Sequence, residues 1–407
     1  MAIDDKIKEC SFCGKTKEQS KKLIVGESAG ICNECVIFCQ ELLGQDIEEF
    51  VKTDIDLDPI HIKEHLDLHV IGQQEAKRMI SVAVANHYKR IYNTKNTPLE
   101  IDKANVLLLG PTGCGKTLLA KSIAKYLDVP FAVADATSLT EAGYVGDDAE
   151  TMISRLLHAA DGDIKQAEKG IIFIDEIDKI TRKSESTSIT RDVSGEGVQQ
   201  ALLKIIEGTI CRVNLTGNRK HPSGEVAEVD TSNILFIAGG AFVGLDTLIK
   251  GRINNTGMGF GSKLSDGTNI DLALVGPQDL LKYGLIPELV GRFTNTVALT
   301  ELDEDQLVQV ASEVKNNLVE QYKYLFSLDN VKLDIKQDAI REIVQRTQKL
   351  KTGARGIHTE LERTLLPHMY NISVYKKQDI KTVVIDKQQV NKPQLLINQE
   401  NKWPKYI

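Results

Sequence analysis

Short, almost entirely apolar runs recur through the middle of the chain, at residues 105–109, 131–135, 170–175 and 233–238. Runs this short and this apolar are typical of strands buried on both faces of a parallel sheet. Helical periodicity is found in the segments around these strands, at residues 74–92, 118–127 and 150–160. This pattern predicts an α/β domain with a parallel sheet, which we place at residues 61–300.

Beyond residue 300 the helical period dominates. We expect helices at residues 303–326, 337–349 and 357–371, with short strands at 331–335 and 382–385. These elements predict a second, mainly helical domain at residues 301–396, followed by a tail at 397–407.

Two polar stretches break the pattern. Residues 45–59 carry six acids against one lysine, so we interpret residues 45–60 as a solvated linker, with an acidic docking segment as the alternative. Residues 251–267 hold five glycines and an apolar tip, Met258-Gly259-Phe260. We interpret this second stretch as a loop whose exposed apolar tip needs a partner.

Composition narrows the functional class. The chain has 407 residues, which suggests about two to four domains. Its net charge of −7 argues against broad binding to nucleic acid or anionic membranes. The charged N-terminus lacks an apolar signal region, and the longest apolar run, 234–245, contains three glycines and is too short to span a bilayer. We therefore expect a cytoplasmic protein whose seven cysteines are metal ligands or free thiols.

A phosphate-binding loop follows the first strand. Residues 110–117 read Gly-Pro-Thr-Gly-Cys-Gly-Lys-Thr and match the G-x-x-x-x-G-K-[ST] pattern. The glycines let backbone N–H groups surround phosphates, Lys116 adds a positive charge, and Thr117 can bind Mg²⁺. Glycine-rich turns also match this pattern, but the strand before it and the helix after it favour a nucleotide site. Cys114 lies at the start of that helix, where we expect a thiolate to be favoured.

A second acidic motif completes the expected nucleotide site. The apolar run at 170–174 ends in Asp175 and Glu176, at the carboxyl end of a strand where parallel sheets place their ligands. Asp175 can bind Mg²⁺ and Glu176 can polarise the attacking water. A core strand ending in solvated acids fits the local pattern equally well. The phosphate loop in the same domain favours the catalytic interpretation.

Four cysteines near the N-terminus have the spacing of a structural zinc site. Cys10 and Cys13 form one C-x-x-C pair, Cys32 and Cys35 form another, and 18 residues, 14–31, separate the pairs. Residues 1–44 contain too few large apolar residues for a core of their own, so bound Zn²⁺ would supply folding energy. A redox dithiol is the alternative, and it lacks the βαβ context typical of such motifs.

A glycine-flanked pair occurs between the second and third strands. Tyr144 and Val145 stand between Gly143 and Gly146, a pattern that fits either a mobile functional loop or an ordinary turn. Two polar loops carry small basic clusters, one with Arg191 and one with residues 219–221. Such clusters are usually solvated surface.

Together these motifs resemble the ClpX family, the AAA+ unfoldase subunits of the Clp protease, from Cys10 to about Leu396. The resemblance implies a P-loop AAA+ nucleotide domain, a small α-helical C-terminal domain and an N-terminal zinc-binding domain with four cysteine ligands. It also implies a homo-hexameric ATPase, with ATP, Mg²⁺ and Zn²⁺ as cofactors. Such a ring would recognise tagged or unfolded protein substrates, some of them delivered by adaptors. It would unfold a folded substrate by drawing it through a central pore, and it would feed the chain to the ClpP peptidase.

The family roles can be assigned to matching positions. Lys116, Asp175, Glu176, Arg355 and Arg292 would be catalytic, with Arg355 as the sensor arginine and Arg292 as a finger reaching the neighbouring subunit's nucleotide. The expected cofactor-binding set also includes Val70, Ile71, Gly110, Pro111, Thr112, Gly113, Cys114, Gly115, Thr117 and Leu118. The resemblance implies pore loops at Tyr144, Val145, Arg191, Arg219, Lys220 and His221, and peptidase docking through Met258, Gly259 and Phe260.

Two other classes share parts of this pattern. A P-loop motor acting on DNA could use the cysteine segment to bind nucleic acid, although the net charge and the lack of a basic aromatic face argue against it. A ring unfoldase of the HslU type shares the ATPase core but lacks the cysteine domain.

Overall fold

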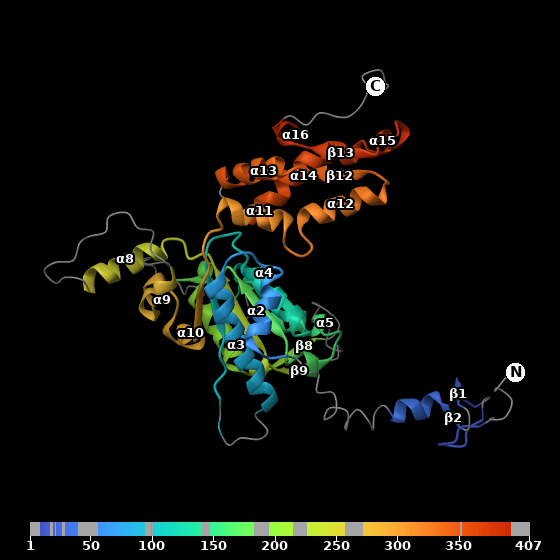
Figure 1. Ribbon diagram of the computed structural model, residues 1–407. Coiled ribbons are helices and arrows are strands. Elements are labelled where there is room, and N and C mark those ends of the chain that lie inside the picture. The colour runs from blue at the N-terminus through green and yellow to red at the C-terminus, as the bar shows by residue number, and fades with distance from the viewer. Residues whose placement is uncertain are drawn as a thin grey trace, which may run out of the picture. The chain divides into compact units, whose positions relative to one another are not determined.

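The computed structural model describes residues 9–16, 19–20, 22–26, 29–39, 56–93, 99, 101–140, 147–182, 195–214, 226–256, 272–350 and 352–391. The chain divides into two compact units, Met1–Asp56 and Leu57–Ile407 (Figure 1). In the first unit, β1 (Leu23–Val25) and β2 (Gly30–Cys32) pair antiparallel, with Leu23 opposite Cys32. Residues 33–39 are helical.

A five-stranded parallel sheet organises the first part of the second unit. Its strand order is β11-β3-β10-β7-β4. The strands are β3 (Val106–Leu109), β4 (Phe131–Asp135), β7 (Ile171–Asp175), β10 (Leu235–Gly240) and β11 (Asn295–Ala298). Strands β3 and β10 are buried along their whole length, as expected for a sheet covered on both faces. The predicted parallel sheet is confirmed, and β11 is a strand that the sequence pattern did not reveal.

Helices and short strands surround this sheet. They are α2 (Pro59–Asp67), α3 (Gln74–Asn93), α4 (Lys116–Tyr126), η3 (Ala136–Ser138), β5 (Leu139–Thr140), β6 (Asp147–Asp148), α5 (Thr151–Ala159), α6 (Ile164–Ala167), η4 (Ile177–Ile180), α7 (Glu196–Glu207), β8 (Ile210–Asn214), β9 (Val226–Asp230), η5 (Thr231–Asn233), α8 (Leu245–Thr256), η6 (Leu272–Leu274), α9 (Pro277–Tyr283) and α10 (Pro287–Arg292). Helix α2 begins at Pro59, capped by Asp58, whose Oδ1 accepts a hydrogen bond from the Ile60 N–H at 2.8 Å. One large apolar core joins the sheet to α5, α6, α7, α8, α9 and α10.

The C-terminal elements enclose a separate apolar core. They are α11 (Glu304–Ser312), α12 (Leu318–Leu328), β12 (Lys332–Ile335), α13 (Gln337–Lys349), α14 (Ala354–Tyr370), α15 (Ile372–Lys377), β13 (Thr382–Ile385) and α16 (Lys387–Asn391). Strands β12 and β13 pair in parallel. The mainly helical character of this region is confirmed.

Two predicted elements were wrong. The single helix expected at residues 303–326 is two helices, because Asn316 adopts a left-handed backbone (φ 61°) and the Oδ1 of Asn317 caps α12 at the Glu320 N–H, 2.9 Å away. The loop expected to start at residue 251 starts later, because α8 runs through Gly251 to Thr256. An ion pair holds this part of α8, with Arg252 Nε 3.0 Å from Asp279 Oδ1 on α9.

Candidate functional site

The phosphate loop is a compact turn between β3 and α4. Its backbone has positive φ at Gly110 (153°), Gly113 (80°) and Gly115 (102°), which is the region that favours glycine. The Lys116 Nζ donates hydrogen bonds to the carbonyl oxygens of Gly110 at 2.7 Å and Pro111 at 3.0 Å. The lysine therefore lies over the loop, with its charge placed where phosphates would lie.

A hydroxyl and a carboxylate that are far apart in the sequence meet at one edge of the sheet. Thr117 Oγ1 lies 3.4 Å from Asp175 Oδ2, the last residue of β7. Glu176 follows in a left-handed backbone conformation (φ 57°), and its N–H donates to Asp175 Oδ1 at 3.0 Å. A non-glycine residue in this conformation is uncommon and is often found at functional sites. The structure thus brings together the hydroxyl and carboxylate expected to hold Mg²⁺.

A cavity of about 420 Å³ joins the phosphate loop, the acidic motif and the C-terminal region. Lys116, Thr117, Leu118, Asp175 and Glu176 line it, and Arg355 enters from the first turn of α14. Its full lining is Thr112, Gly113, Gly115, Lys116, Thr117, Leu118, Asp175, Glu176, Asp178, Lys179, Gly240, Ala241, Val243, Ala354 and Arg355. The cations Lys116 and Arg355 and the carboxylates of Asp175 and Glu176 are the kinds of group needed to bind and hydrolyse a nucleotide with Mg²⁺.

The phosphate loop and the start of α14 are in close contact. A Cβ added to Gly113 would lie 3.0 Å from the Ala354 nitrogen, and one added to Gly353 would lie 2.8 Å from the Thr112 oxygen. Gly353 also has a positive φ of 58°, so a side chain there would be strained as well as crowded. The two glycines allow the approach that brings Arg355 to the cavity.

Asp178 is a site residue that the sequence reasoning missed. It is buried, and its carboxylate accepts hydrogen bonds from the N–H groups of Ala241 at 3.1 Å and Phe242 at 3.3 Å. A Cβ on Gly240 would lie 2.7 Å from Asp178 Oδ1, so the end of β10 is glycine where this carboxylate packs. The sequence did contain a signal for this residue, because Asp178 is the third acid within residues 175–178. Its role becomes clear only from its contact with the end of β10.

Val70, which was expected to contact the cofactor, lies close to the phosphate loop. It is buried, and a Cβ added to Gly115 would lie 3.9 Å from its Cγ1. Its carbonyl accepts a hydrogen bond from the buried Lys77 Nζ, which also donates to Asp67 Oδ1 at 2.8 Å. Ile71, next to it, is half-buried. A buried lysine with two acceptors is a firm anchor for this turn.

Arg292 lies away from the cavity. Its carbonyl accepts a hydrogen bond from Asn105 Nδ2 at 3.2 Å, and Asn105 immediately precedes β3. The phosphate loop follows the other end of that strand, about 13 Å farther along at 3.3 Å per residue. The guanidinium instead pairs with Glu207, so Arg292 does not join the other expected catalytic residues in this chain.

One chemical expectation was wrong. Cys114 was expected to favour the thiolate at the start of α4, but its side chain is buried, and burial raises the pKa of the thiol above its ordinary value. Lys116 nearby lowers the pKa, but by less than burial raises it. A Cβ on Gly110 would lie 3.2 Å from the Cys114 Sγ, so the thiol packs under the loop as a small apolar group.

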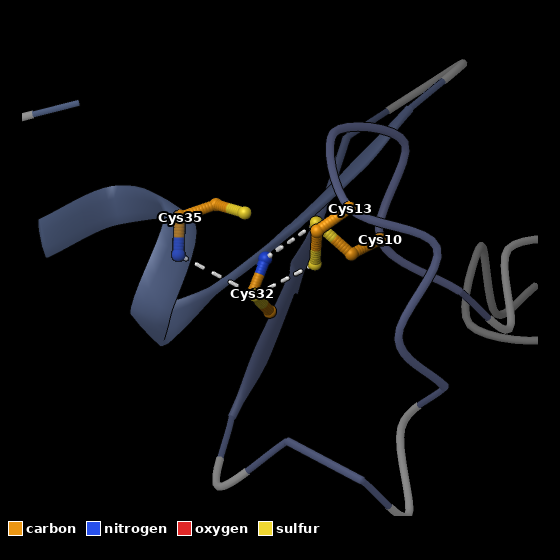
Figure 2. A group of neighbouring side chains, drawn as sticks. All are labelled: Cys10, Cys13, Cys32 and Cys35. Carbon is orange, nitrogen blue, oxygen red and sulfur yellow. Dashed lines mark hydrogen bonds between the residues drawn. The ribbon is translucent and has the colours of Figure 1, made fainter. Parts of the chain in front are cut away.

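The four N-terminal cysteines converge as predicted (Figure 2). Their Sγ atoms all lie within 4.8 Å of one another, close to the spacing of about 3.8 Å that tetrahedral zinc–sulfur bonds require. Backbone N–H groups donate to two of the sulfurs, from Cys32 to Cys10 at 3.3 Å and from Cys35 to Cys32 at 3.4 Å. Such bonds favour thiolates, so the cluster fits Zn²⁺ with all four positions closed.

The remaining expected residues lie outside the described part of the chain: Tyr144, Val145, Arg191, Arg219, Lys220, His221, Met258, Gly259 and Phe260. Two of the segments that contain these residues are flanked by paired strands. Strands β5 and β6 flank residues 141–146, with Thr140 opposite Asp148, and the hairpin β8–β9 flanks residues 215–225, with Asn214 opposite Val226. Among the helices of the described residues, none combines the length and the apolar character needed to span a bilayer.

Comparison with known proteins agrees with this geometry. Residues 8–45 match the ClpX C4-type zinc finger, residues 101–296 match the AAA domain of the Cdc48 subfamily, and residues 302–385 match the C-terminal D2-small domain of ClpB protein. The ATP-dependent Clp protease ATP-binding subunit ClpX of Treponema denticola is 50% identical over 393 residues, which cover 94% of this chain and 93% of that protein. The chain therefore belongs to the ClpX family of AAA+ proteins.

Proposed function

We propose that this protein is an ATP-driven unfoldase and translocase that works as a homo-hexameric ring and feeds protein substrates to the ClpP peptidase. The chain is an AAA+ ATPase with ATP, Mg²⁺ and Zn²⁺ as cofactors. The similar protein of Treponema denticola is named as the ATP-binding subunit of an ATP-dependent Clp protease. The partnership with a peptidase is carried to this chain on that similarity.

We further propose five functional segments. Residues 1–44 form the zinc-binding domain, 45–60 the acidic linker, 61–300 the large ATPase domain, 301–396 the small helical domain and 397–407 a tail. The two separate apolar cores on either side of residue 300 support the division within the ATPase.

The observation that carries the proposal is the 420 Å³ cavity in which Lys116, Asp175 and Glu176 meet Arg355. Phosphoryl transfer to water requires little covalent chemistry from a protein; it requires charge stabilisation and an oriented nucleophile. Lys116 and Arg355 supply positive charge for the phosphates. Thr117 and Asp175 would hold Mg²⁺, which would offset the negative charge of the phosphates. Glu176 would orient and polarise the attacking water.

Arg355 links this chemistry to movement of the small domain. It lies on α14, whose start touches the phosphate loop through Gly353 and Gly113. A γ-phosphate in the cavity would attract the Arg355 guanidinium, and its loss on hydrolysis would remove that attraction. The arrangement of the two domains would then depend on the nucleotide state, as in other ligand-gated closures.

Arg292 would act on the nucleotide of a neighbouring subunit. Its backbone is tied to Asn105, at the opposite end of β3 from its own phosphate loop. An arginine side chain cannot cover the length of that strand and reach its own cavity. A second subunit in a ring would bring its phosphates to this arginine, which makes the assembly necessary for hydrolysis.

Substrate contact and peptidase docking remain assigned by resemblance. We propose that Tyr144 and Val145 grip the polypeptide, that Arg191 and residues 219–221 line the channel and its entrance, and that Met258-Gly259-Phe260 docks on ClpP. The pairing of β5 with β6 supports the first assignment, because it ties the two ends of segment 141–146 together, and Leu139 of β5 packs in the apolar core. A loop held this way would move with the domain that binds ATP.

Loss of fluorescence from a stably folded, tagged reporter tests the proposed function. The full-length protein with ATP and Mg²⁺ should abolish the fluorescence, whereas ADP should not. Glu176→Gln is the matched control, since it should retain nucleotide binding and leave the reporter folded. ATP hydrolysis at a normal rate without loss of fluorescence, across reporters tagged at either end, would contradict an unfoldase function.

A further inference from the structure

The guanidinium of Arg292 is held by one carboxylate within its own chain. Its Nε and Nη2 both donate to Oε1 of Glu207, at 2.9 and 2.6 Å. Arg292 ends α10 and Glu207 ends α7, so the pair joins the carboxyl ends of two helices. Both side chains are partly exposed, so the contact is open to solvent and to a neighbouring subunit.

The position of Glu207 is unfavourable for the stability of its own helix. The carboxyl end of a helix carries a partial negative charge, which disfavours a carboxylate and favours a cation. Arg292 offsets this repulsion. It is itself a cation at the carboxyl end of α10, where the helix dipole favours positive charge. The pair therefore neutralises Glu207 and at the same time restricts the arginine side chain.

The contact leaves part of the guanidinium outside the pair. The Arg292 backbone is fixed by Asn105, and the Nε–Nη2 edge is fixed by Glu207. Nη1 takes no part in this contact, so its N–H groups remain outside the ion pair with Glu207. Because one edge of the planar guanidinium is already held, the arginine side chain would lose less conformational entropy when it binds a phosphate.

We infer that Glu207 is a positioning residue that orients Arg292 toward the phosphates of the neighbouring subunit. This inference rests on the proposed role of Arg292 across the interface. The opposite role, a latch that withholds Arg292 from the phosphates, predicts the opposite kinetic change. Hydrolysis rates therefore distinguish orientation from withholding.

Steady-state hydrolysis by the full-length protein gives the first test. Glu207→Ala should lower kcat about two- to fivefold, the range typical of an exposed ion pair, with little change in KM for ATP because Glu207 does not line its own cavity. Glu207→Gln, which keeps an acceptor oxygen, should recover part of that loss. Glu228→Ala is the control, because it breaks another surface ion pair, the more exposed Arg212–Glu228 pair, 3.0 Å long, in the same domain. A rise in kcat for Glu207→Ala would overturn the inference.

Mixed rings show in which subunit Glu207 acts. Chains with Lys116→Ala can donate Arg292, and chains with Arg292→Ala can hydrolyse ATP only if a neighbour donates that arginine. Glu207→Ala added to the donor chain should lower the recovered activity about two- to fivefold, and Glu207→Ala added to the hydrolysing chain should not. Equal effects in both chains, or none in either, would overturn the inference.

The same mixtures separate this inference from the proposed function. If mixing Lys116→Ala and Arg292→Ala chains restores no activity while mixed rings form, Arg292 does not act across the interface. The inference then falls together with its premise. If activity is restored but does not depend on Glu207 in the donor chain, only the inference fails.

Discussion

Thr117 and Asp175 meet although β3, which precedes Thr117, and β7, which ends in Asp175, are not neighbouring strands. The Thr117 Oγ1 and Asp175 Oδ2 are 3.4 Å apart, and β10 lies between β3 and β7 in the sheet. The contact is possible because the carboxyl ends of parallel strands share one edge. The end of β10 is glycine, and a Cβ on Gly239 would lie 2.7 Å from Phe173 on β7. The intervening strand thus leaves room for the two motifs to share one cavity.

Glu176→Gln should preserve nucleotide binding and slow hydrolysis by orders of magnitude. The amide has nearly the same shape as the carboxylate but cannot accept a proton from water. Single-turnover hydrolysis measures the rate, and equilibrium binding of labelled ATP provides the control. Near-normal turnover with normal binding would remove Glu176 from the mechanism.

Cys13→Ser should unfold the zinc-binding segment while leaving ATP hydrolysis largely intact. One Zn²⁺ per chain should be found in the wild type and lost in the variant, because the four thiolates close a single tetrahedron. Metal analysis and hydrolysis are measured on the same preparation. The ATPase core is a separate compact unit, so complete loss of hydrolysis would contradict this prediction.

Cys114 should react slowly with iodoacetamide at neutral pH and faster as the pH rises above the ordinary range of a thiol. Burial raises its pKa, so the reactive thiolate forms at higher pH than in an exposed cysteine. Site-specific mass spectrometry follows the labelling. Bound nucleotide should protect Cys114 further, because the thiol lies within the phosphate loop. Fast labelling at pH 7, unaffected by nucleotide, would count against the buried position.

His87 should make the large domain less stable as the pH falls below about 6.5. Burial, with smaller contributions from Arg90 and Lys103, lowers its pKa from 6.5 to about 3, while its Nε2 lies 3.0 Å from the Asn233 carbonyl. The unfolded chain therefore binds a proton that the folded chain excludes, which costs about 1 kcal/mol of stability between pH 7 and pH 5.5.

His87→Gln provides the matched comparison. Glutamine can donate to the Asn233 carbonyl but cannot titrate, so the variant should lose less stability over the same interval. Urea midpoints of the large-domain transition, followed by circular dichroism, measure the difference. Identical pH profiles for the two proteins would show that His87 does not contribute.

Phe260→Ala should separate unfolding from degradation. Residue 260 lies outside the described residues, and the prediction rests on the apolar tip in the sequence. Burying a phenylalanine in a partner's pocket contributes roughly 1.5–3 kcal/mol, and several tips in a ring would add avidity. ATP hydrolysis and reporter unfolding should continue, and degradation by added ClpP should stop. Loss of unfolding as well would place Phe260 in the ATPase core.

The sequence alone determined those features of the protein that depend on local chemistry. The phosphate loop, the Asp175–Glu176 strand end and the two cysteine pairs are short segments whose function depends on residue type and spacing. Apolar runs marked β3, β7 and β10, because strands buried on both faces need no polar alternation. The apolar run of β4 also marked a strand, although its residues alternate between buried and exposed at an edge of the sheet. The edge strand β11 escaped this pattern, because only one of its four residues is fully buried.

Only the tertiary structure decided which distant groups meet. Asp178 became a site residue through the N–H groups of Ala241 and Phe242, which the chain order does not bring near it. Burial reversed the expected ionisation of Cys114, because desolvation outweighed the helix end and Lys116. The ion pair of Arg292 with Glu207 joins residues 85 positions apart. Each of these effects depends on packing between separate elements, and a local sequence pattern carries no information about such packing.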